Sequence, residues 1–273
     1  MTVRNSLSVA IAGLGAIGLP VARALEAGRV PGLVLAVVAV RDPAKAVAAF
    51  GDFKAPPRIA VIEELGALAD VVVECAPKAV FRAIAESALR RGRIFIPLSV
   101  GQMLDHMDLV DLAAKHGGRI VVPTGALLGL DAVRAVSEGV VSSVTIVTRK
   151  PPAGLKGAPH LVENNISVDG LTAPLRVFSG SAREAIKGFP ANVNVAVALS
   201  LAGIGPDKTR VEVWADPTSL RNTHTIEVTS DSSDFTMTIA GRPTESNPAT
   251  GRITPLSALA TLRRLTAPLV VGT

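Results

Sequence analysis

The stretch Leu7-Ser8-Val9-Ala10-Ile11-Ala12-Gly13-Leu14-Gly15-Ala16-Ile17-Gly18 places the pattern G-x-G-x-x-G directly after an apolar run. An amphipathic run follows at 19–27, and a β-branched run at 34–40 completes a strand–helix–strand unit of about thirty residues. In such a unit the first glycine permits a tight turn, the second admits a pyrophosphate, and the third lets helix and strand pack closely. The helix N-terminus presents free N–H groups to the phosphates. The pattern therefore predicts a dinucleotide site, with a purely structural turn in another α/β protein as the alternative.

The first 122 residues alternate between strand-like and helix-like runs. The strand-like runs are 7–12, 34–40, 58–62, 71–74, 93–98 and 119–122, and the helix-like runs are 19–27, 43–50, 78–91 and 104–116. Parallel strands need helical crossovers, so this alternation predicts an α/β fold with a doubly wound parallel sheet. We expect a Rossmann domain over residues 1–122.

The pattern changes after Pro123-Thr124-Gly125. Alternating apolar and polar residues predict strands at 140–148, 175–179, 210–215, 223–229 and 235–239, and helices are expected at 128–137 and 191–202. We expect an α+β domain over 123–252 with a mainly antiparallel sheet, which carries substrate and forms a homodimer through its open face. A closing helix at about 253–267 is expected to pack back on the first domain. The segment 150–159, with three prolines and two glycines, is predicted to be a mobile loop.

The composition narrows the class of partner. The chain has 273 residues, 48% of them hydrophobic and 19% charged, which is typical of a globular protein. The net charge is +5, but the basic residues are dispersed and lack interleaved aromatics, which argues against a nucleic-acid partner. Anionic small molecules suit such a surface. No apolar run reaches the ~20 residues that cross a bilayer, and the single cysteine, Cys75, indicates a reducing, cytoplasmic setting.

The end of the second predicted strand bears on the choice between NAD and NADP. An NAD site usually has an acid there, about 20 residues past the glycines, to bind the ribose. This chain has Arg41 and then Asp42. Arg41 can pair with a 2′-phosphate, which favours NADP. Asp42 can bind the ribose or cap the next helix with Pro43 at its first position, and a third reading makes both residues simple loop charges.

Further cofactor contacts are expected at the carboxyl ends of two strands, since open α/β sheets bind ligands at that edge. Cys75 and Ala76 follow the fourth predicted strand, and Ser99 follows the fifth. Main-chain groups there can line the nicotinamide ribose. The alternative is a pair of tight turns. Cys75 itself is expected to be a small core residue rather than a nucleophile.

Of the four histidines, His224 has the most informative position, where a loop enters an alternating strand of the second domain. A histidine there suits acid–base work near pH 7. His106 and His116 lie in a charged helix pattern and are expected to face solvent. The sequence does not decide whether His160 has a functional role. No cluster of ligands has metal-binding spacing.

Several motifs together resemble the L-aspartate dehydrogenase family. They are G-S-A-R-E-A at 180–185, F-P-A-N-V-N-V-A at 189–196, L-S-L-A-G at 199–203, A-D-P at 215–217, N-T-H at 222–224 and N-P-A-T at 247–250. In the first half, the glycine pattern, V-E-C-A at 73–76 and S-V-G at 99–101 agree with it. The resemblance thus spans nearly the whole chain. One departure is Thr124, where the family often has proline.

This resemblance implies NAD- or NADP-dependent oxidation of L-aspartate to iminoaspartate. The product then hydrolyses to oxaloacetate and ammonia, or feeds NAD biosynthesis. By resemblance, His224 matches the active-site histidine, and Ala126 and Asn194 match dinucleotide contacts.

Two substrate carboxylates need cationic or N–H donors, for which Arg149 and Lys150 are candidates unless they are surface charges. Two alternative functions remain. The chain is then either another two-domain dehydrogenase with a different small anionic substrate or a non-catalytic dinucleotide sensor.

Overall fold

The computed structural model of the protein describes residues 6–190, 194–244 and 251–272. The chain divides into two compact units. The first comprises residues 1–123 and 254–270, and the second comprises residues 124–253 and 271–273.

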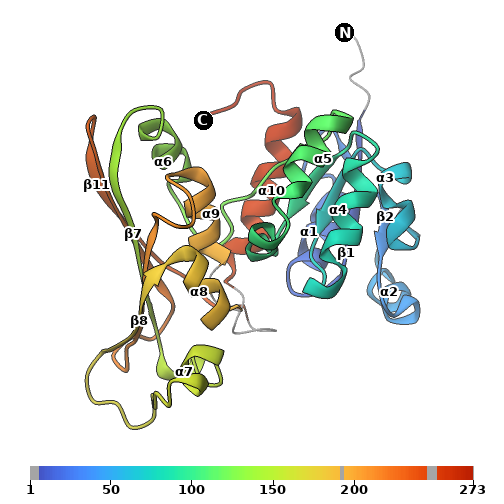
Figure 1. Cartoon of the computed structure of the whole chain (residues 1–273). Helices are drawn as coiled ribbons and strands as arrows, with labels where there is room; N and C mark the ends of the chain where they lie inside the picture. The colour runs from blue at the N-terminus through green and yellow to red at the C-terminus, as the bar shows by residue number, and fades with distance from the viewer. Residues whose placement is uncertain (1–5, 191–193, 245–250, 273) are drawn as a thin grey trace. The chain divides into compact units, whose positions relative to one another are not determined.

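The first unit is built on a six-stranded sheet in the order β3-β2-β1-β4-β5-β6, in which every neighbouring pair is parallel (Figure 1). The strands are β1 Leu7–Ala12, β2 Leu33–Ala39, β3 Arg58–Ile59, β4 Val71–Glu74, β5 Ile94–Pro97 and β6 Arg119–Ile120. This is the strand order of a dinucleotide-binding fold, and it confirms the predicted parallel α/β sheet. The valines of β4 are completely buried, as a central strand covered on both faces requires.

Six helices accompany this sheet within the described residues. They are α1 Gly18–Glu26, α2 Pro43–Ala49, α3 Leu65–Leu68, α4 Phe81–Leu89, α5 Asp108–His116 and α10 Ile253–Thr266, with 3₁₀ helices at η1 Ile62–Glu64, η2 Lys78–Val80 and η3 Val100–Asp105. The last helix comes from the far end of the chain. Its Ala258 and Leu262 are buried in one core cluster with Val9 and Ile11 of β1.

Two helical segments of this unit differ from the expectation. The sequence did not predict α3, a short helix whose Gly66 lies so close to α4 that a Cβ atom would stand 1.8 Å from the carbonyl oxygen of Ser87. The helix predicted over 104–116 begins only at Asp108, because 100–105 forms η3. The 3₁₀ turn places Val100 and Met103 on one face, since residues three apart eclipse in that helix, and both are buried.

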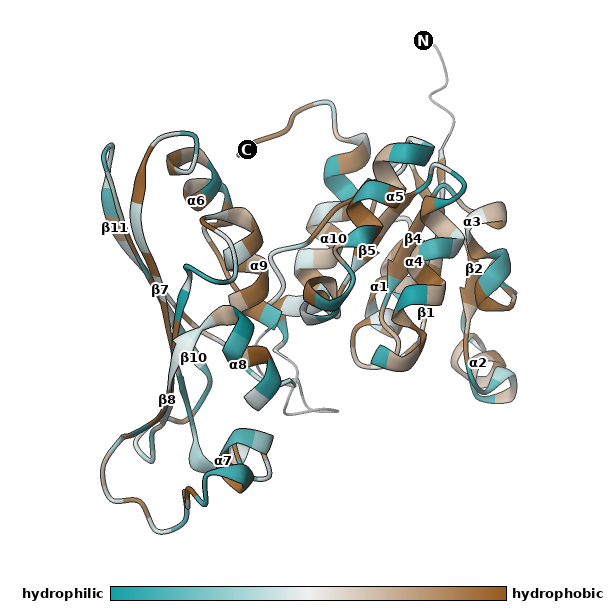
Figure 2. Ribbon diagram, viewed as in Figure 1, coloured by the Kyte–Doolittle hydropathy of each residue, from teal (hydrophilic) through white to brown (hydrophobic). Residues whose placement is uncertain are grey.

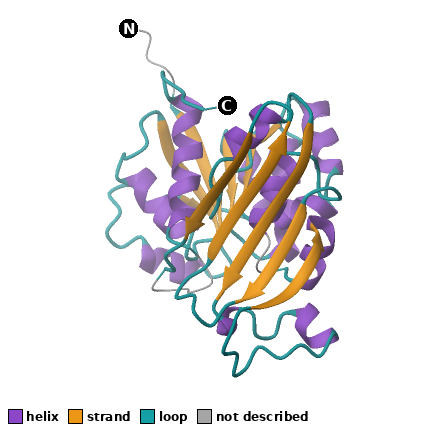
Figure 3. Cartoon of the chain, turned by 90° about the vertical axis from the view of Figure 1, so that its left-hand side faces the viewer, coloured by secondary structure: helices purple, strands orange, loops and turns teal. Residues whose placement is uncertain are grey.

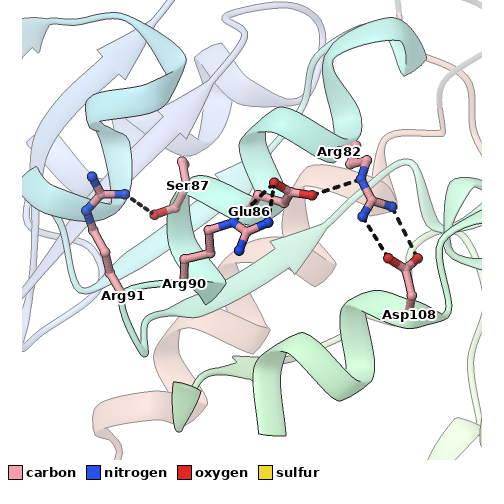
Figure 4. A network of polar contacts seen from close by, with 6 residues as sticks. All are labelled: Arg82, Glu86, Ser87, Arg90, Arg91 and Asp108. Carbon is pink, nitrogen blue, oxygen red and sulfur yellow. Dashed lines mark hydrogen bonds and ion pairs between the residues drawn. The ribbon is translucent and has the colours of Figure 1, made fainter. Parts of the chain in front are cut away.

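Ion pairs connect the solvent side of α4 to the start of α5 (Figure 4). Arg82 reaches Asp108 at 2.7 Å and Glu86 at 2.8 Å, and Arg90 reaches the same Glu86 at 3.0 Å. Exposed pairs of this kind are worth about 0–1 kcal/mol each, so the network orients these helices more than it stabilises them.

The second unit is built on a five-stranded sheet in the order β11-β10-β7-β9-β8. The strands are β7 Val141–Lys150, β8 Leu175–Ser181, β9 Arg210–Ala215, β10 Thr223–Ser230 and β11 Asp234–Ala240. The sheet is mainly antiparallel, as predicted, with one parallel pair between β7 and β9. The central strand, β7, therefore has β10 on one side and β9 on the other.

Helices cover one face of this sheet and leave the other open, the face toward the viewer in Figure 3. The helices of the unit are α6 Leu130–Val136, α7 Pro159–Glu163, α8 Ala182–Gly188 and α9 Asn194–Ala202. The ribbon of α9 is largely apolar in Figure 2, in keeping with a buried helix. Along β7, Val144, Ile146, Thr148 and Lys150 alternate onto the buried face.

The sequence did not predict α7 or α8. The start of α8 has a clear signal, a capping box in which Ser181 and Glu184 exchange hydrogen bonds. The segment 150–159, predicted to be a mobile loop, contains the 3₁₀ turn η4 Pro152–Gly154 and a buried Leu155. Residues 191–193 of the predicted helix, and the motif at 247–250, lie outside the described residues. Within the described part of the chain, the longest apolar helices are too short to cross a bilayer.

Candidate active site

The glycine loop between β1 and α1 shows why each of its three glycines is needed. At Gly13, φ is +92° and a Cβ atom would lie 2.4 Å from the carbonyl oxygen of Cys75. At Gly18, a Cβ atom would lie 1.9 Å from the carbonyl oxygen of Gly13, so α1 begins in contact with the turn. At Gly15, no heavy atom of the described residues lies within 4 Å of the Cβ position. The outer face of the loop is therefore open at Gly15 alone among the three.

This open face lies at the N-terminus of α1. Ile17 stands at the N-cap, where its side chain has no polar atom to cap the helix, and the first turn contains no acidic residue. Leu19 N–H donates to the Gly15 carbonyl at 3.1 Å, and Pro20 has no N–H. The partial positive charge of the helix and the N–H groups before Leu19 are therefore what this end of α1 offers an anion. The space that a Cβ on Gly15 would fill fits a pyrophosphate. The predicted loop residues Gly13, Gly15, Ala16, Ile17 and Gly18 form this cradle.

A buried glutamate organises the neighbouring sheet edge. Glu74, at the end of β4, is completely buried and accepts four hydrogen bonds: from Ala76 N–H at 2.9 Å, Leu98 N–H at 3.2 Å, Ser99 N–H at 2.9 Å and Ser99 Oγ at 3.0 Å. Burial raises the pKa of Glu74, and the four donors offset part of that rise because they favour the ionised carboxylate. Glu74 thus joins the turn after β4 to the turn after β5.

These contacts define what the predicted residues at this edge offer a ligand. The N–H groups of Ala76 and Ser99 donate to Glu74, and the Ser99 carbonyl accepts from Gln102 N–H at 2.9 Å. Ala76 and Ser99 can therefore contact a ligand through their surface, but their N–H groups are already used by Glu74. Burial, followed by the charge of Glu74, raises the pKa of the Cys75 thiol well above its usual value. Cys75 therefore stays protonated and is a poor nucleophile.

At the end of β2, the two predicted ribose contacts have different environments. The Asp42 carboxylate caps α2 by accepting from Lys45 N–H at 3.1 Å, with Pro43 at the first helical position. Arg41, the residue before it, is exposed. The capping interpretation of Asp42 is therefore confirmed, and Arg41 presents a guanidinium at the carboxyl edge of the sheet.

In the second unit, His224 lies in a buried polar cluster at one end of the sheet. It stands opposite Thr148 in the β10–β7 pairing, and Thr148 Oγ1 lies 2.9 Å from its Nδ1. Lys150 lies two residues beyond Thr148 and hence on the same face. Thr148, Lys150 and His224 are all buried, with 4–6% of their surface exposed. The apolar face of the sheet thus becomes polar at this end.

Burial sets the protonation of the two titratable groups in this cluster. Burial, followed by the positive charge of Lys150, lowers the pKa of His224 from 6.5 to about 4. Burial alone lowers the pKa of Lys150 from 10.5 to about 8. At neutral pH the imidazole is therefore neutral and the amine is mostly charged. The tautomer with hydrogen on Nδ1 donates to Thr148 and leaves Nε2 as a proton acceptor.

The structure separates the two cations that were expected to hold substrate carboxylates. Arg149 lies on the opposite face of β7 from Lys150, because neighbouring residues of a strand point to opposite faces. Its guanidinium lies 3.5 Å from Asp216 and 4.6 Å from the centre of the Trp214 ring. Lys150 alone lies in the cluster with His224.

The other predicted contacts of the second unit lie in exposed or half-buried backbone. Ala126 is half-buried in a turn in which Leu127 N–H donates to Thr124 at 3.1 Å. Asn194 is exposed and is the first residue of α9.

The remaining histidines differ from one another. His116 is exposed, but the expectation that His106 faces solvent is wrong: its ring is half-buried and stacks on Phe81 at 5.8 Å. His160 packs against Phe178 at 5.2 Å and Phe189 at 5.4 Å. Among the described residues, no three His, Cys, Asp or Glu side chains gather as a metal site would require.

Sequence reasoning missed two residues of these sites. Thr148 was treated only as the end of a strand, yet it contacts His224 Nδ1. Its signal was a polar residue at an inward position beyond Val144 and Ile146. Glu74 carried a similar signal, as an acid directly after three valines.

Two family models match the chain. The model described as "Homoserine dehydrogenase, NAD binding domain" matches residues 13–123, and "Aspartate dehydrogenase, C-terminal" matches residues 131–265. The first match covers most of the parallel sheet and includes the glycine loop. The predicted class of cofactor, NAD or NADP, is thereby confirmed.

Solved structures share the fold. The chain resembles the aspartate dehydrogenase of Thermotoga maritima with a TM-score of 0.72 and 24% identity, over 97% of this chain and 99% of that one. It also resembles myo-inositol dehydrogenase from Lactobacillus casei, with a TM-score of 0.57 and 13% identity, over 94% and 83% of the two chains. At these identities the likeness shows the fold alone.

Sequence relatives determine the family. The chain is 58% identical to L-aspartate dehydrogenase of Bradyrhizobium diazoefficiens, over 100% of this chain and 96% of the relative. It is 54% identical to L-aspartate dehydrogenase 3 of Bordetella bronchiseptica, over the full length of both. The chain therefore belongs to the L-aspartate dehydrogenase family.

Proposed function

We propose that this chain catalyses the NAD- or NADP-dependent oxidative deamination of L-aspartate, reversibly. The observation that carries the proposal is the buried, neutral His224, held through Nδ1 by Thr148 and adjoined by Lys150, in a chain of this family. The nicotinamide, when bound, supplies the hydride acceptor, so that L-aspartate becomes iminoaspartate, which water hydrolyses to oxaloacetate and ammonia.

His224 is the proposed acid–base residue. Oxidation of an amine requires a neutral nitrogen at Cα, so a base must take a proton from the substrate ammonium. His224 Nε2 accepts that proton and passes it to solvent. The neutral nitrogen then removes a proton from the attacking water and returns it to the departing ammonia. Acid–base catalysis by a positioned side chain typically supplies ~10²–10⁴ in rate. Lys150 is the proposed contact for one substrate carboxylate, because its charge lies on the same face as His224.

The first proposed cofactor contacts belong to the parallel sheet of the first unit. The glycine loop cradles the pyrophosphate, and Cys75, Ala76 and Ser99 form a surface for the nicotinamide ribose. By the family resemblance, Ala126 and Asn194 are also proposed as dinucleotide contacts. Since Asp42 caps α2 and Arg41 is exposed, the proposed preference is for NADP, whose 2′-phosphate pairs with a guanidinium.

The test is a spectrophotometric assay with purified protein. L-Aspartate with NADP⁺ or NAD⁺ should produce reduced nicotinamide, and oxaloacetate with ammonia should consume it. His224→Gln should retain cofactor affinity and lose at least 100-fold in kcat. Absence of turnover in both directions would refute the proposed reaction. Unchanged kcat in the variant would remove His224 from the mechanism.

We also propose that the chain is a cytoplasmic homodimer that pairs through the open face of its second sheet. That face contains the half-exposed Trp214 and Val147 among threonine and serine side chains. Static light scattering of the wild type should give twice the chain mass, and Trp214→Glu should give a monomer. A monomeric wild type would contradict this proposal.

A further inference from the structure

Lys150 occupies an unusual place for an ammonium group. It is the last residue of the central strand, with 6% of its surface exposed, on the face where Val144 and Ile146 form the apolar core. Burial removes part of the hydration of this ammonium group and so lowers the pKa of Lys150. Two loops flank it: the one after β9, where Asp216 N–H donates to the Lys150 carbonyl at 2.8 Å, and the one that leads into His224.

Among the described residues, Lys150 is the charged group that lowers the pKa of the His224 imidazole. On β7, Thr148 stands opposite His224, and on β11 the opposite residue is Ile239. The helix α9 carries no charged residue. The Asp216 carboxylate accepts from Thr218 N–H at 2.9 Å and Oγ1 at 2.7 Å and pairs with Arg149, which lies on the opposite face of β7 from Lys150.

This arrangement makes His224 a weak base before substrate arrives. With a pKa of about 4, its imidazole takes up few protons at neutral pH, whereas an efficient general base has a pKa near the working pH. Part of that lowering comes from the charge of Lys150. A substrate carboxylate placed against Lys150 would offset this charge and so raise the pKa of His224 when the base is needed.

We propose that Lys150 links substrate binding to catalysis by receiving a substrate carboxylate and thereby allowing His224 to take up a proton. The proposal rests on the proposed function and adds to it a mechanism by which the substrate activates its own base. Release of the dicarboxylate product restores the field of Lys150 and expels the proton from His224. The coupling operates entirely within the second unit, between β7 and β10.

Proton uptake on binding of succinate tests this coupling without turnover. Isothermal titration calorimetry in buffers of different ionisation enthalpy measures the protons taken up per bound succinate. At pH 6.5 Lys150 is charged in both states, so uptake there reports His224. We expect the wild type to take up about half a proton more than His224→Gln, if the pKa of bound His224 rises to ~6.5. Ionisation of succinate itself is common to both proteins and cancels.

Variants at Lys150 separate its charge from its packing. Lys150→Met should lose the uptake at pH 6.5 and bind succinate at least tenfold more weakly. Lys150→Arg keeps the charge and should keep that uptake, but should lose the additional uptake that wild type shows at pH 8.5, where Lys150 itself titrates. Lys208→Gln removes an exposed lysine of the same unit and should behave as wild type.

The outcomes distinguish this inference from the proposed function. Equal uptake by wild type and His224→Gln at pH 6.5, or failure of wild type to bind succinate, would overturn the coupling. Turnover of L-aspartate, measured on the same samples, would stand in either case. Coupling without turnover would instead refute the proposed reaction and leave the role of Lys150 in carboxylate binding intact.

Discussion

Substitution of Gly15 by alanine should weaken cofactor binding without weakening the fold. The added Cβ meets no heavy atom of the described residues within 4 Å, and φ at Gly15 lies outside the left-handed region. The unfolded chain loses conformational freedom, so the free energy of unfolding should stay equal or rise by about 0.4–1 kcal/mol. The methyl group nevertheless fills the space proposed for the pyrophosphate. The dissociation constant for NADPH should therefore rise at least tenfold, which corresponds to about 1.4 kcal/mol.

Gly18→Ala is the matched control, with the same methyl group three residues later. Its Cβ would stand 1.9 Å from the Gly13 carbonyl oxygen, and the two atoms must separate to 3.0 Å or more. Because both partners are backbone, this variant should lose about 1–3 kcal/mol of unfolding free energy. Urea unfolding followed by circular dichroism measures stability, and NADPH fluorescence measures binding. If Gly15→Ala binds NADPH as tightly as the wild type, the pyrophosphate does not approach Gly15.

Three further substitutions test the other sites. Glu74→Gln places an NH₂ group against the N–H donors that now bind the carboxylate, so the free energy of unfolding should fall by about 1.5–3 kcal/mol. Urea titrations at pH 7 measure this change. An unchanged free energy of unfolding would mean that the four hydrogen bonds contribute little. His224 binds its proton more weakly in the folded protein, so the free energy of unfolding should fall as the pH drops from 6.5 towards 4. His224→Gln should remove about 3 kcal/mol of that fall. If the free energies of unfolding of the two proteins change with pH in parallel, the pKa of about 4 is contradicted. Arg41→Ala should raise KM for NADP⁺ at least tenfold and leave KM for NAD⁺ within twofold, whereas equal effects on both cofactors would exclude a contact with the 2′-phosphate.

The sequence was most informative where one local pattern determines one geometry. Gly13, Gly15 and Gly18 could be assigned distinct roles in advance, because the glycine pattern between a strand and a helix determines the local turn. The close approach of Gly13 to Cys75, which lies far away in the sequence, appeared only in the structure. The buried strand at 71–74 was equally clear, since its valines leave no polar face. In the second unit, alternation located all five strands to within a few residues.

The sequence did not predict contacts between residues that are far apart along the chain. The role of Thr148 depends on the register that places it opposite His224, and no local pattern specifies that register. Arg149 and Lys150 were considered together because they are adjacent, yet the alternation of a strand sends them to opposite faces. With the extent of the strand known to reach Lys150, that separation would have been predictable. The helix α3 was missed because it has only four residues and is held by close packing at Gly66.

The position of α10 has a consequence for how this protein forms during synthesis. All six strands of the first sheet have been made by residue 120, but Ala258 and Leu262, which complete its core, come from the last tenth of the chain. Thr266 and Arg263 also hydrogen-bond to the backbone at Pro31 and Arg29. The ribosome must therefore release almost the whole chain before the first unit closes its core. Until then apolar surface on β1 and α1 stays uncovered, and at 5–20 residues per second that interval lasts on the order of ten seconds.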